Sequence, residues 1–247
     1  MFCTLLVQAI PAYAILAGGE FDLPADTPSQ RIDSLGAASP FNFIGALELT
    51  VGAQAYKGSA SALSRNWVLT AGHNVDFNDD GRADDGLVVS LHLPGFGSYT
   101  ADSIVVHPDF TGFGSPSIHN DLSLLYFDDP LPDGLVFPAL GLSLNLQDTV
   151  TLTGFGRSGY GSYGYTTSAS LTDRRIGLNE IDSFQPESGG AGLLFRYDFD
   201  APATTGLPDG SLGNALETII GPGDSGGPAL IEWGGGHAIV GVNTFTE

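Results

Sequence analysis

The stretch Gly221-Pro222-Gly223-Asp224-Ser225-Gly226-Gly227-Pro228 surrounds one serine with glycines and places an aspartate directly before it. Glycine adopts backbone conformations that other residues avoid, and it lets another part of the chain approach closely. Successive amide N–H groups around such a bend can point at one oxygen atom, as an oxyanion hole requires. The stretch therefore predicts a bend that presents the hydroxyl of Ser225.

Two stretches upstream carry the groups that a serine nucleophile needs. A serine hydroxyl is a weak nucleophile unless a base, and a group that orients this base, lie beside it. His73 ends the run Leu69-Thr70-Ala71-Gly72-His73, and Asp121 lies in Asn120-Asp121-Leu122 at the start of a second apolar run. These two residues are the candidates for the base and the orienting acid.

The three stretches together resemble, in order and approximate spacing, the signatures of trypsin-like (chymotrypsin-fold) serine endopeptidases. The resemblance covers roughly residues 40 to 247. It implies that Ser225 is the nucleophile, His73 the general base and Asp121 the acid that orients the base. It also implies that the N–H groups of Gly223 and Ser225 form the oxyanion hole.

Gly223-Asp224-Ser225-Gly226-Gly227 also satisfies the G-x-S-x-G pattern of the α/β-hydrolases. In that fold the acid and the histidine follow the serine along the chain. Only 22 residues follow Ser225, and they contain no helical stretch. The order of the motifs and their context therefore exclude this alternative.

Short apolar or alternating runs, separated by Gly, Pro, Asn and Asp, predict an all-β chain, and no window has a sustained helical period. The first series of expected strands is 44–51, 62–70, 87–93, 104–107 and 122–127. The second series is 150–155, 193–199, 228–231 and 238–242.

The resemblance implies that these two series of strands form two six-stranded-type antiparallel β-barrels with the active-site cleft between them. We expect an extended segment over 15–43, a first barrel over 44–135 with His73 and Asp121, and a second barrel over 136–247 with Ser225. The family continues beyond the position of Phe245 with another strand and a helix. The second barrel is therefore expected to be truncated at its C-terminal end or to close differently.

The charge of the chain excludes some partners. Lys and Arg total 8 against 28 Asp and Glu, a formal net charge of −20. Such a surface repels phosphates and anionic membranes, which disfavours nucleic acid and membrane partners. The expected partner is a polypeptide substrate, and we expect a monomer. Cys3 is the single cysteine, so no intrachain disulfide can form, and Asn74 stands where many family members carry a cysteine.

The N-terminal residues are typical of an export signal. Residues 2–10 are mostly apolar and Ala12-Tyr13-Ala14 fits the small-x-small cleavage pattern, although no Lys or Arg precedes the apolar run. We therefore predict a signal peptide over 1–14 and a secreted or periplasmic location. Cleavage there would expose Ile15, and the resemblance implies that its new ammonium group pairs with Asp224. The alternative is a disordered mature terminus.

Residues for substrate selection are implied by the resemblance alone. The family's primary pocket has at its base the residue six positions before the serine, which is Ile219. An apolar floor favours neutral or apolar P1 side chains and offers no counter-charge to Lys or Arg. The segment Thr244-Phe245-Thr246 corresponds to the wall of that pocket and to the strand that pairs with the substrate.

An acidic stretch three residues after His73 follows part of a calcium-loop pattern. Asp76, Asn78, Asp80 and Asp84 stand at positions 1, 3, 5 and 9 of an EF-hand-type loop that has glycine at position 6. Position 12 is Leu87 instead of the expected glutamate. A structural Ca²⁺ and a solvated acidic turn are equally compatible with this pattern, and no cofactor is required for the chemistry.

Two functions from different classes remain. The first is a secreted serine endopeptidase that works through an acyl-enzyme. The second is a protease-like, calcium-stabilised binding or adhesion module with weak turnover. The dispersed residues His73, Asp121 and Ser225 favour the first, because a binding module has no need for all three.

Overall fold

The computed structural model describes residues 15–17, 27–112, 119–141, 143–161, 163–187, 192–199, 212–213 and 216–245. In these ranges the only helices are two 3-10 turns, η1 (Gly36–Ala38) and η2 (Gly72–Asn74), and the rest is strand and loop. The all-β expectation is confirmed. No helix in the described part of the chain has the length and apolar character of a membrane span.

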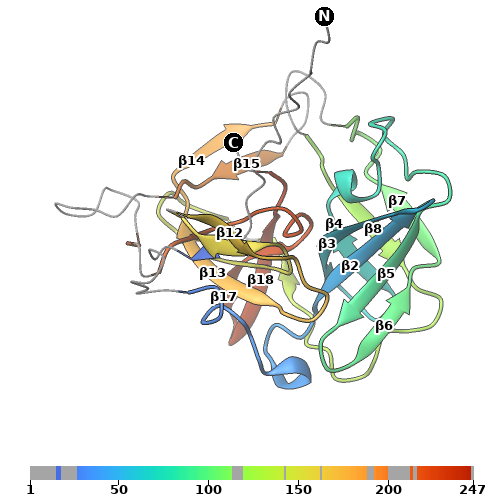
Figure 1. Ribbon diagram of the computed structural model, residues 1–247. Helices are drawn as coiled ribbons and strands as arrows, with labels where there is room; N and C mark the ends of the chain where they lie inside the picture. Colours follow the sequence, from blue (N-terminus) through green and yellow to red (C-terminus); the bar gives the residue numbers. More distant parts are fainter. Residues whose placement is uncertain are drawn as a thin grey trace, which may run out of the picture.

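The first lobe is one antiparallel sheet with the strand order β6-β5-β2-β3-β4-β8-β7. Its strands are β2 (Ile44–Val51), β3 (Gln54–Ala62), β4 (Trp67–Thr70), β5 (Val88–Leu93), β6 (Gly97–Thr100), β7 (Ser103–Val106) and β8 (Ser123–Tyr126). The edge strands β6 and β7 are consecutive in the chain. Between them, Ala101 N donates to Val89 O at 2.9 Å and Asp102 N to Tyr126 O at 2.8 Å. These bonds bring the two ends of the sheet together, so that it curls into a barrel (Figure 1).

The second lobe contains a five-stranded sheet, β13-β10-β17-β18-β9, a four-stranded sheet, β12-β11-β1-β16, and the hairpin β14-β15. Its strands are β1 (Leu16–Ala17), β9 (Ala139–Leu140), β10 (Thr149–Gly154), β11 (Ser158–Tyr160), β12 (Gly164–Thr167), β13 (Arg175–Glu180), β14 (Ser183–Pro186), β15 (Leu193–Arg196), β16 (Thr218–Ile219), β17 (Pro228–Trp233) and β18 (Gly236–Val242). Most pairs are antiparallel, as expected. The pairs β1–β11 and β9–β18 are parallel and depart from the expectation.

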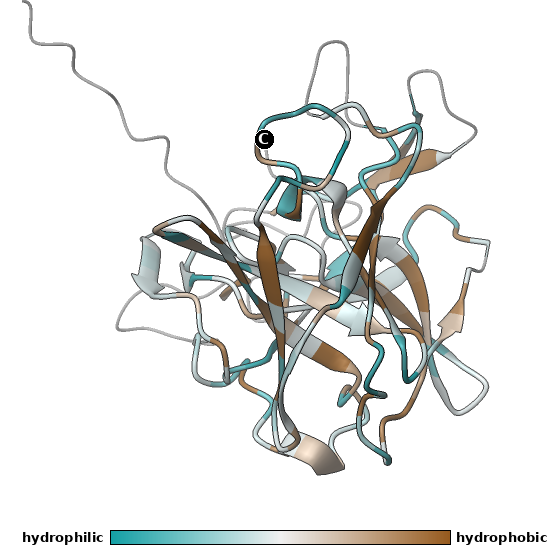
Figure 2. Ribbon diagram, turned by 90° about the vertical axis from the view of Figure 1, so that its right-hand side faces the viewer, coloured by the Kyte–Doolittle hydropathy of each residue, from teal (hydrophilic) through white to brown (hydrophobic). Residues whose placement is uncertain are grey.

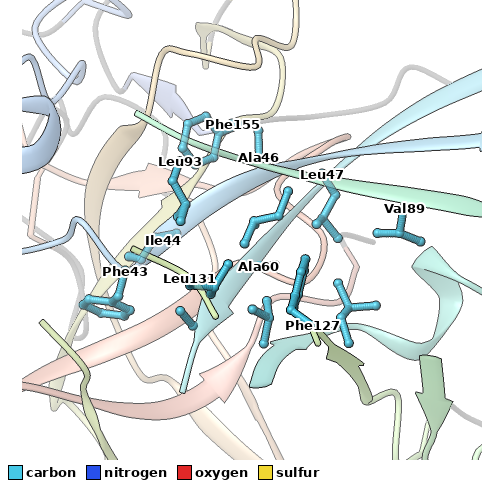
Figure 3. Close-up of a cluster of buried hydrophobic side chains, with 14 of the residues drawn as sticks. Phe43, Ile44, Ala46, Leu47, Ala60, Val89, Leu93, Phe127, Leu131 and Phe155 are labelled. Atoms are coloured by element: carbon cyan, nitrogen blue, oxygen red, sulfur yellow. The ribbon is translucent and has the colours of Figure 1, made fainter. Parts of the chain in front are cut away.

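Apolar side chains from both lobes form one buried cluster. Alternate residues of β5 point inward, and Val89, Leu91 and Leu93 are almost completely buried. Figure 3 shows Val89 and Leu93 within this cluster together with Phe155, which comes from the second lobe. The strands also carry most of the hydrophobic colour in Figure 2. Because the core continues between the lobes, their relative position is held by apolar burial.

A buried ion pair attaches the segment before β2 to the second lobe. Arg174 is completely buried, and its Nη2 lies 2.7 Å from Asp33 Oδ2. Its Nη1 also donates to Ile44 O at 3.1 Å. A buried charge is tolerated when it is paired and hydrogen-bonded in this way. The described part of the expected extended segment is therefore anchored between the lobes.

Candidate active site

His73 and Asp121, two of the predicted catalytic residues, are in direct contact. His73 lies in η2 after β4, and Asp121 lies directly before β8, the strand that pairs with β4. Asp121 Oδ2 is 2.8 Å from His73 Nδ1, and Asp121 Oδ1 accepts the His73 backbone N–H at 2.8 Å. Two contacts from one carboxylate fix both the ring and its backbone. The adjacent strands of one sheet bring these residues together across 48 positions of sequence.

Asp121 has a third partner, Thr244, whose bond to this carboxylate was not expected from the sequence. The Thr244 hydroxyl donates to Asp121 Oδ2. Burial alone would raise the pKa of the Asp121 carboxyl, but the contacts with His73 and Thr244 hold it below its ordinary value. The carboxylate is therefore ionised at neutral pH. Thr244 also lines the pocket described below.

The turn that carries Ser225 lies against the first lobe. Ser225 O accepts hydrogen bonds from Ser59 N in β3 and from Nδ2 of Asn74, each at 2.8 Å. The Ser59 hydroxyl donates to Gly223 O at 2.7 Å. Asn74 is the neighbour of His73, so Ser225 is held beside the histidine turn. The Ser225 hydroxyl forms no hydrogen bond with any described residue. Such a bond is often long without substrate.

The backbone around Ser225 leaves two N–H groups available. Gly223 has a φ of +94°, which favours glycine, and this conformation makes the tight turn before the serine. The N–H groups of Gly223 and Ser225 donate no hydrogen bond within the described chain, whereas the intervening Asp224 N–H donates to Gly221 O. Two unused donors on either side of one bonded amide are what an oxyanion hole needs.

Asp224 is completely buried and is surrounded by backbone donors. Its carboxylate accepts N–H groups from Ile15 at 2.6 Å, Gly156 at 2.8 Å and Gly221 at 3.0 Å. Burial raises the pKa of this carboxyl to about 7, because the three amides and the guanidinium of Arg175 offset only part of the desolvation. Ile15 was expected beside Asp224, and its backbone N–H contacts that carboxylate.

Arg175 is a charged residue near Asp224 that the sequence did not reveal. Its side chain is buried, and its Nη1 donates to Gly156 O at 2.7 Å. Gly156 in turn donates its N–H to Asp224, so one residue links the guanidinium to the carboxylate. The Nε of Arg175 has no hydrogen-bond partner among the residues that the structure describes. Burial lowers the pKa of Arg175, and the charge of Asp224 acts against that shift.

A cavity of about 940 Å³ extends from Asp121 along β18 to the hairpin β14-β15. Ile219, Thr244 and Phe245, three of the predicted substrate-binding residues, line it. Thr246 lies outside the described residues. Charged side chains also line the cavity, which the expectation of an apolar pocket did not include: Asp182, Glu187, Arg196 and Asp198.

The acidic loop after His73 binds its own backbone. The Asp76 carboxylate accepts N–H groups from Asp80 at 3.0 Å and Gly81 at 2.8 Å. Asn78 Oδ1 accepts the Asp80 N–H at 3.0 Å, and Asp84 Oδ2 accepts the Phe77 N–H at 2.7 Å. Among the described residues, no group of three or more His, Cys, Asp or Glu side chains is arranged to hold a metal ion. The loop does not form a ready cation cage, and calcium binding stays a prediction.

The two lobes, with the His73 and Ser225 turns facing each other between them, have the chymotrypsin-like double β-barrel fold. Among solved structures, the chain is similar to HL collagenase, a chymotrypsin-fold serine protease determined at 1.7 Å resolution. The identity is 18% and the TM-score 0.53, over 84% of this chain and 82% of that one. A search of protein-family models gave no match, and neither did a search of the curated proteins. At this identity the similarity establishes the fold.

Proposed function

We propose that the chain is a secreted serine endopeptidase that hydrolyses peptide bonds through an acyl-enzyme. Ser225 Oγ attacks the substrate carbonyl while His73 takes its proton, and His73 later returns the proton to the leaving amine. Asp121 keeps the ring in the tautomer that presents Nε2 to the serine and stabilises the imidazolium. The N–H groups of Gly223 and Ser225 bind the oxyanion, which is worth about 3 to 4 kcal/mol of transition-state stabilisation.

The observation that carries the proposal is the double contact between Asp121 and the His73 residue. A structural histidine needs neither a buried, ionised carboxylate on Nδ1 nor a second bond from the same carboxylate to its backbone. This arrangement orients a base, and the two unused N–H groups beside Ser225 supply the complementary electrostatics.

A serine-directed organophosphonate tests the proposal directly. We expect the wild-type protein to gain one adduct at Ser225, detected by mass spectrometry of the peptide, and Ser225→Ala to gain none. Ser123→Ala serves as the matched control, because the hydroxyl of this buried serine donates to Ala71 O and takes no part in the proposed chemistry. Labelling at other sites only, or no labelling of an intact protein, would contradict the assignment.

The proposed P1 preference is for neutral or apolar side chains. Ile219 offers no counter-charge at the expected floor of the cavity, and Thr244 and Phe245 lie along its wall. Digestion of a peptide library should therefore give cleavage mainly after uncharged residues. Cleavage mainly after Lys or Arg would overturn this preference without affecting the assignment of the nucleophile.

Activation by cleavage before Ile15 is a further part of the proposal. Hydrolysis of that bond would convert the Ile15 amide, which already contacts Asp224, into an ammonium group. A cation at 2.6 Å from a buried carboxylate stabilises its ionised form far more than a neutral amide does. The turn from Gly223 to Ser225, here named the oxyanion turn, would then be held by an ion pair at Asp224.

The second candidate is a protease-like binding module with weak turnover. The raised pKa of Asp224, at about 7, favours it, because a partly protonated Asp224 holds the oxyanion turn less firmly. The labelling experiment separates the two candidates, since a binding module would leave Ser225 unmodified.

A further inference from the structure

The side chain directly after His73 joins the two lobes. Asn74 is 4% exposed, and its Nδ2 donates to Thr70 Oγ1 at 2.9 Å and to Ser225 O at 2.8 Å. The first bond stays within the first lobe, while the second reaches the second lobe across 151 positions of sequence. One amide group therefore connects the turn that carries His73 to the turn that carries Ser225.

This amide belongs to a closed ring of hydrogen bonds. Thr70 accepts a bond from Asn74 and donates its own hydroxyl to Ser59 O at 2.8 Å. Ser59 N then donates to Ser225 O at 2.8 Å, and Asn74 donates to the same oxygen. Buried polar groups that are satisfied within such a network make the local structure rigid.

The neighbouring strand leaves room for the amide. A Cβ on Gly58 of β3 would lie 2.8 Å from Nδ2 and 3.0 Å from Cγ of Asn74. In a disulfide, each Cβ lies roughly 3 Å from the sulfur of its partner residue. Positions 58 and 74 thus have the separation of a disulfide pair, and the chain has Gly and Asn there instead.

We propose that Asn74 is a positioning residue whose amide keeps Ser225 and His73 in register across the lobe boundary, at a point where no covalent bond joins the two lobes. This inference rests on the proposed hydrolase function. The N–H donors of the amide are essential, because a carboxylate of the same shape would place a negatively charged oxygen against the partly negative oxygen of the Ser225 carbonyl. A misplacement of about 1 Å at a reacting group can cost about a hundredfold in rate.

The first test compares Asn74→Asp with Asn66→Asp. Asn66 Nδ2 donates to Phe127 O at 2.6 Å within the first lobe, so its variant also loses one amide–carbonyl bond. We expect Asn74→Asp to lower kcat for a peptide substrate about 10- to 100-fold with KM within about twofold. Asn66→Asp should lower the melting temperature and leave kcat nearly unchanged. Equal kcat losses in the two folded variants would overturn the inference.

The second test replaces the amide with a covalent bond that stays within the first lobe. In a Cys3→Ser background, Gly58→Cys combined with Asn74→Cys should form a disulfide under oxidising conditions, measured by thiol titration. The bridge fixes the turn after His73 to β3 but supplies no donor to Ser225 O, so we expect kcat of the bridged protein to stay as low as that of Asn74→Cys alone. A return of kcat to within a few-fold of wild type on oxidation would contradict the inference, because fixing the turn would then suffice without the bond to Ser225.

The outcomes for the two proposals are distinguishable. Wild-type protein that neither cleaves peptide nor reacts with the organophosphonate contradicts the proposed function itself. Active wild-type protein whose Asn74→Asp variant behaves like Asn66→Asp contradicts only the role of Asn74.

Discussion

The first and second lobes each place one buried aspartate beside the candidate site, and the pKa values of the two carboxyls shift in opposite directions. Asp121 contacts an imidazole and a hydroxyl, which hold its pKa below the ordinary value against burial. Asp224 contacts three backbone amides, and burial raises its pKa to about 7. Neutral amides offset desolvation less well than a group that can carry the opposite charge. Asp121 therefore has a partner that can carry a positive charge, whereas among the described residues no cation contacts Asp224 directly.

The largest expected effect comes from changing the first of these carboxylates. Asp121→Asn should lower kcat about 10⁴-fold, because an amide stabilises the wrong tautomer of His73 and cannot stabilise the imidazolium. Steady-state kinetics with a peptide substrate measures this loss. Asp102→Asn is the control, since Asp102 has no part in the proposed chemistry and its Oδ2 accepts the Asp128 N–H, so its removal should leave kcat unchanged. A loss below tenfold for Asp121→Asn would refute the assigned role.

A smaller effect is expected from supplying the missing cation to the second carboxylate. A chain that begins at Ile15 should have a kcat/KM about tenfold higher at pH 6 than the chain that retains residues 1–14, because a carboxyl with a pKa of about 7 is only about one-tenth ionised at that pH and the ammonium group would keep it ionised. Active-site titration and initial rates measure the difference. Asp224→Asn should abolish the gain. Equal rates for the two chain lengths would show that the Ile15 amide suffices.

The pH dependence of stability should have opposite signs at the two carboxylates. In a Ser225→Ala background, the folded pKa of Asp224, about 7, lies above the ordinary 3.8, so its contribution is full below about pH 4 and is lost as the pH rises through 7. Asp121, with its lowered pKa, contributes above its ordinary pKa and loses this contribution as the pH falls through the folded value. The expected amplitude for Asp224 is a few kcal/mol.

Urea unfolding at several pH values measures both contributions, with Asp224→Asn and Asp121→Asn as the variants. The other ionisable groups near Asp224 keep their charge over this range: Arg175 stays protonated, and burial together with Asp224 raises the pKa of Tyr197. If the difference in unfolding free energy between wild type and variant changed with pH in the same direction for both carboxylates, the comparison would fail.

The smallest expected effect concerns the acidic loop. Its carboxylates already accept the loop's own amides, so a cation would have to bind weakly, and calcium at millimolar concentration should raise the melting temperature by only a few degrees. Magnesium at the same concentration is the control, because this ion keeps its water more tightly. An unchanged melting temperature would remove the calcium interpretation.

Strands with alternating or continuous apolar residues were predictable, whereas several others, among them β3 and β13, were not. The expected strand at 44–51 coincides with β2, and those near 87–93 and 122–127 differ from β5 and β8 by a residue at one or both ends. β3 was missed because Gly58 and the following Ser and Ala residues have no apolar alternation. Their small size has a tertiary reason, since this part of β3 packs against Asn74 and the Ser225 turn.

The candidate site was predictable as a set of residue types and only partly as a structure. His73, Asp121, Asp224 and Ile15 carry motifs, and the structure brings them together in two pairs. Ser59, Asn74 and Arg175 carry none. Each acts through a hydrogen bond to the backbone of a distant residue, and a backbone carbonyl leaves no mark on the sequence at the position that provides it.

The sequence by itself determined which chemical groups are present: one hydroxyl in a glycine-rich bend, one imidazole and one carboxylate. Their order along the chain fits the chymotrypsin fold and excludes the α/β-hydrolase fold. Only the tertiary structure decided how these groups meet, which carboxylate is ionised and which amide holds the lobes in register. The physical reason is that burial and hydrogen bonding depend on neighbours in space. Those neighbours come from segments that meet across more than a hundred residues of chain.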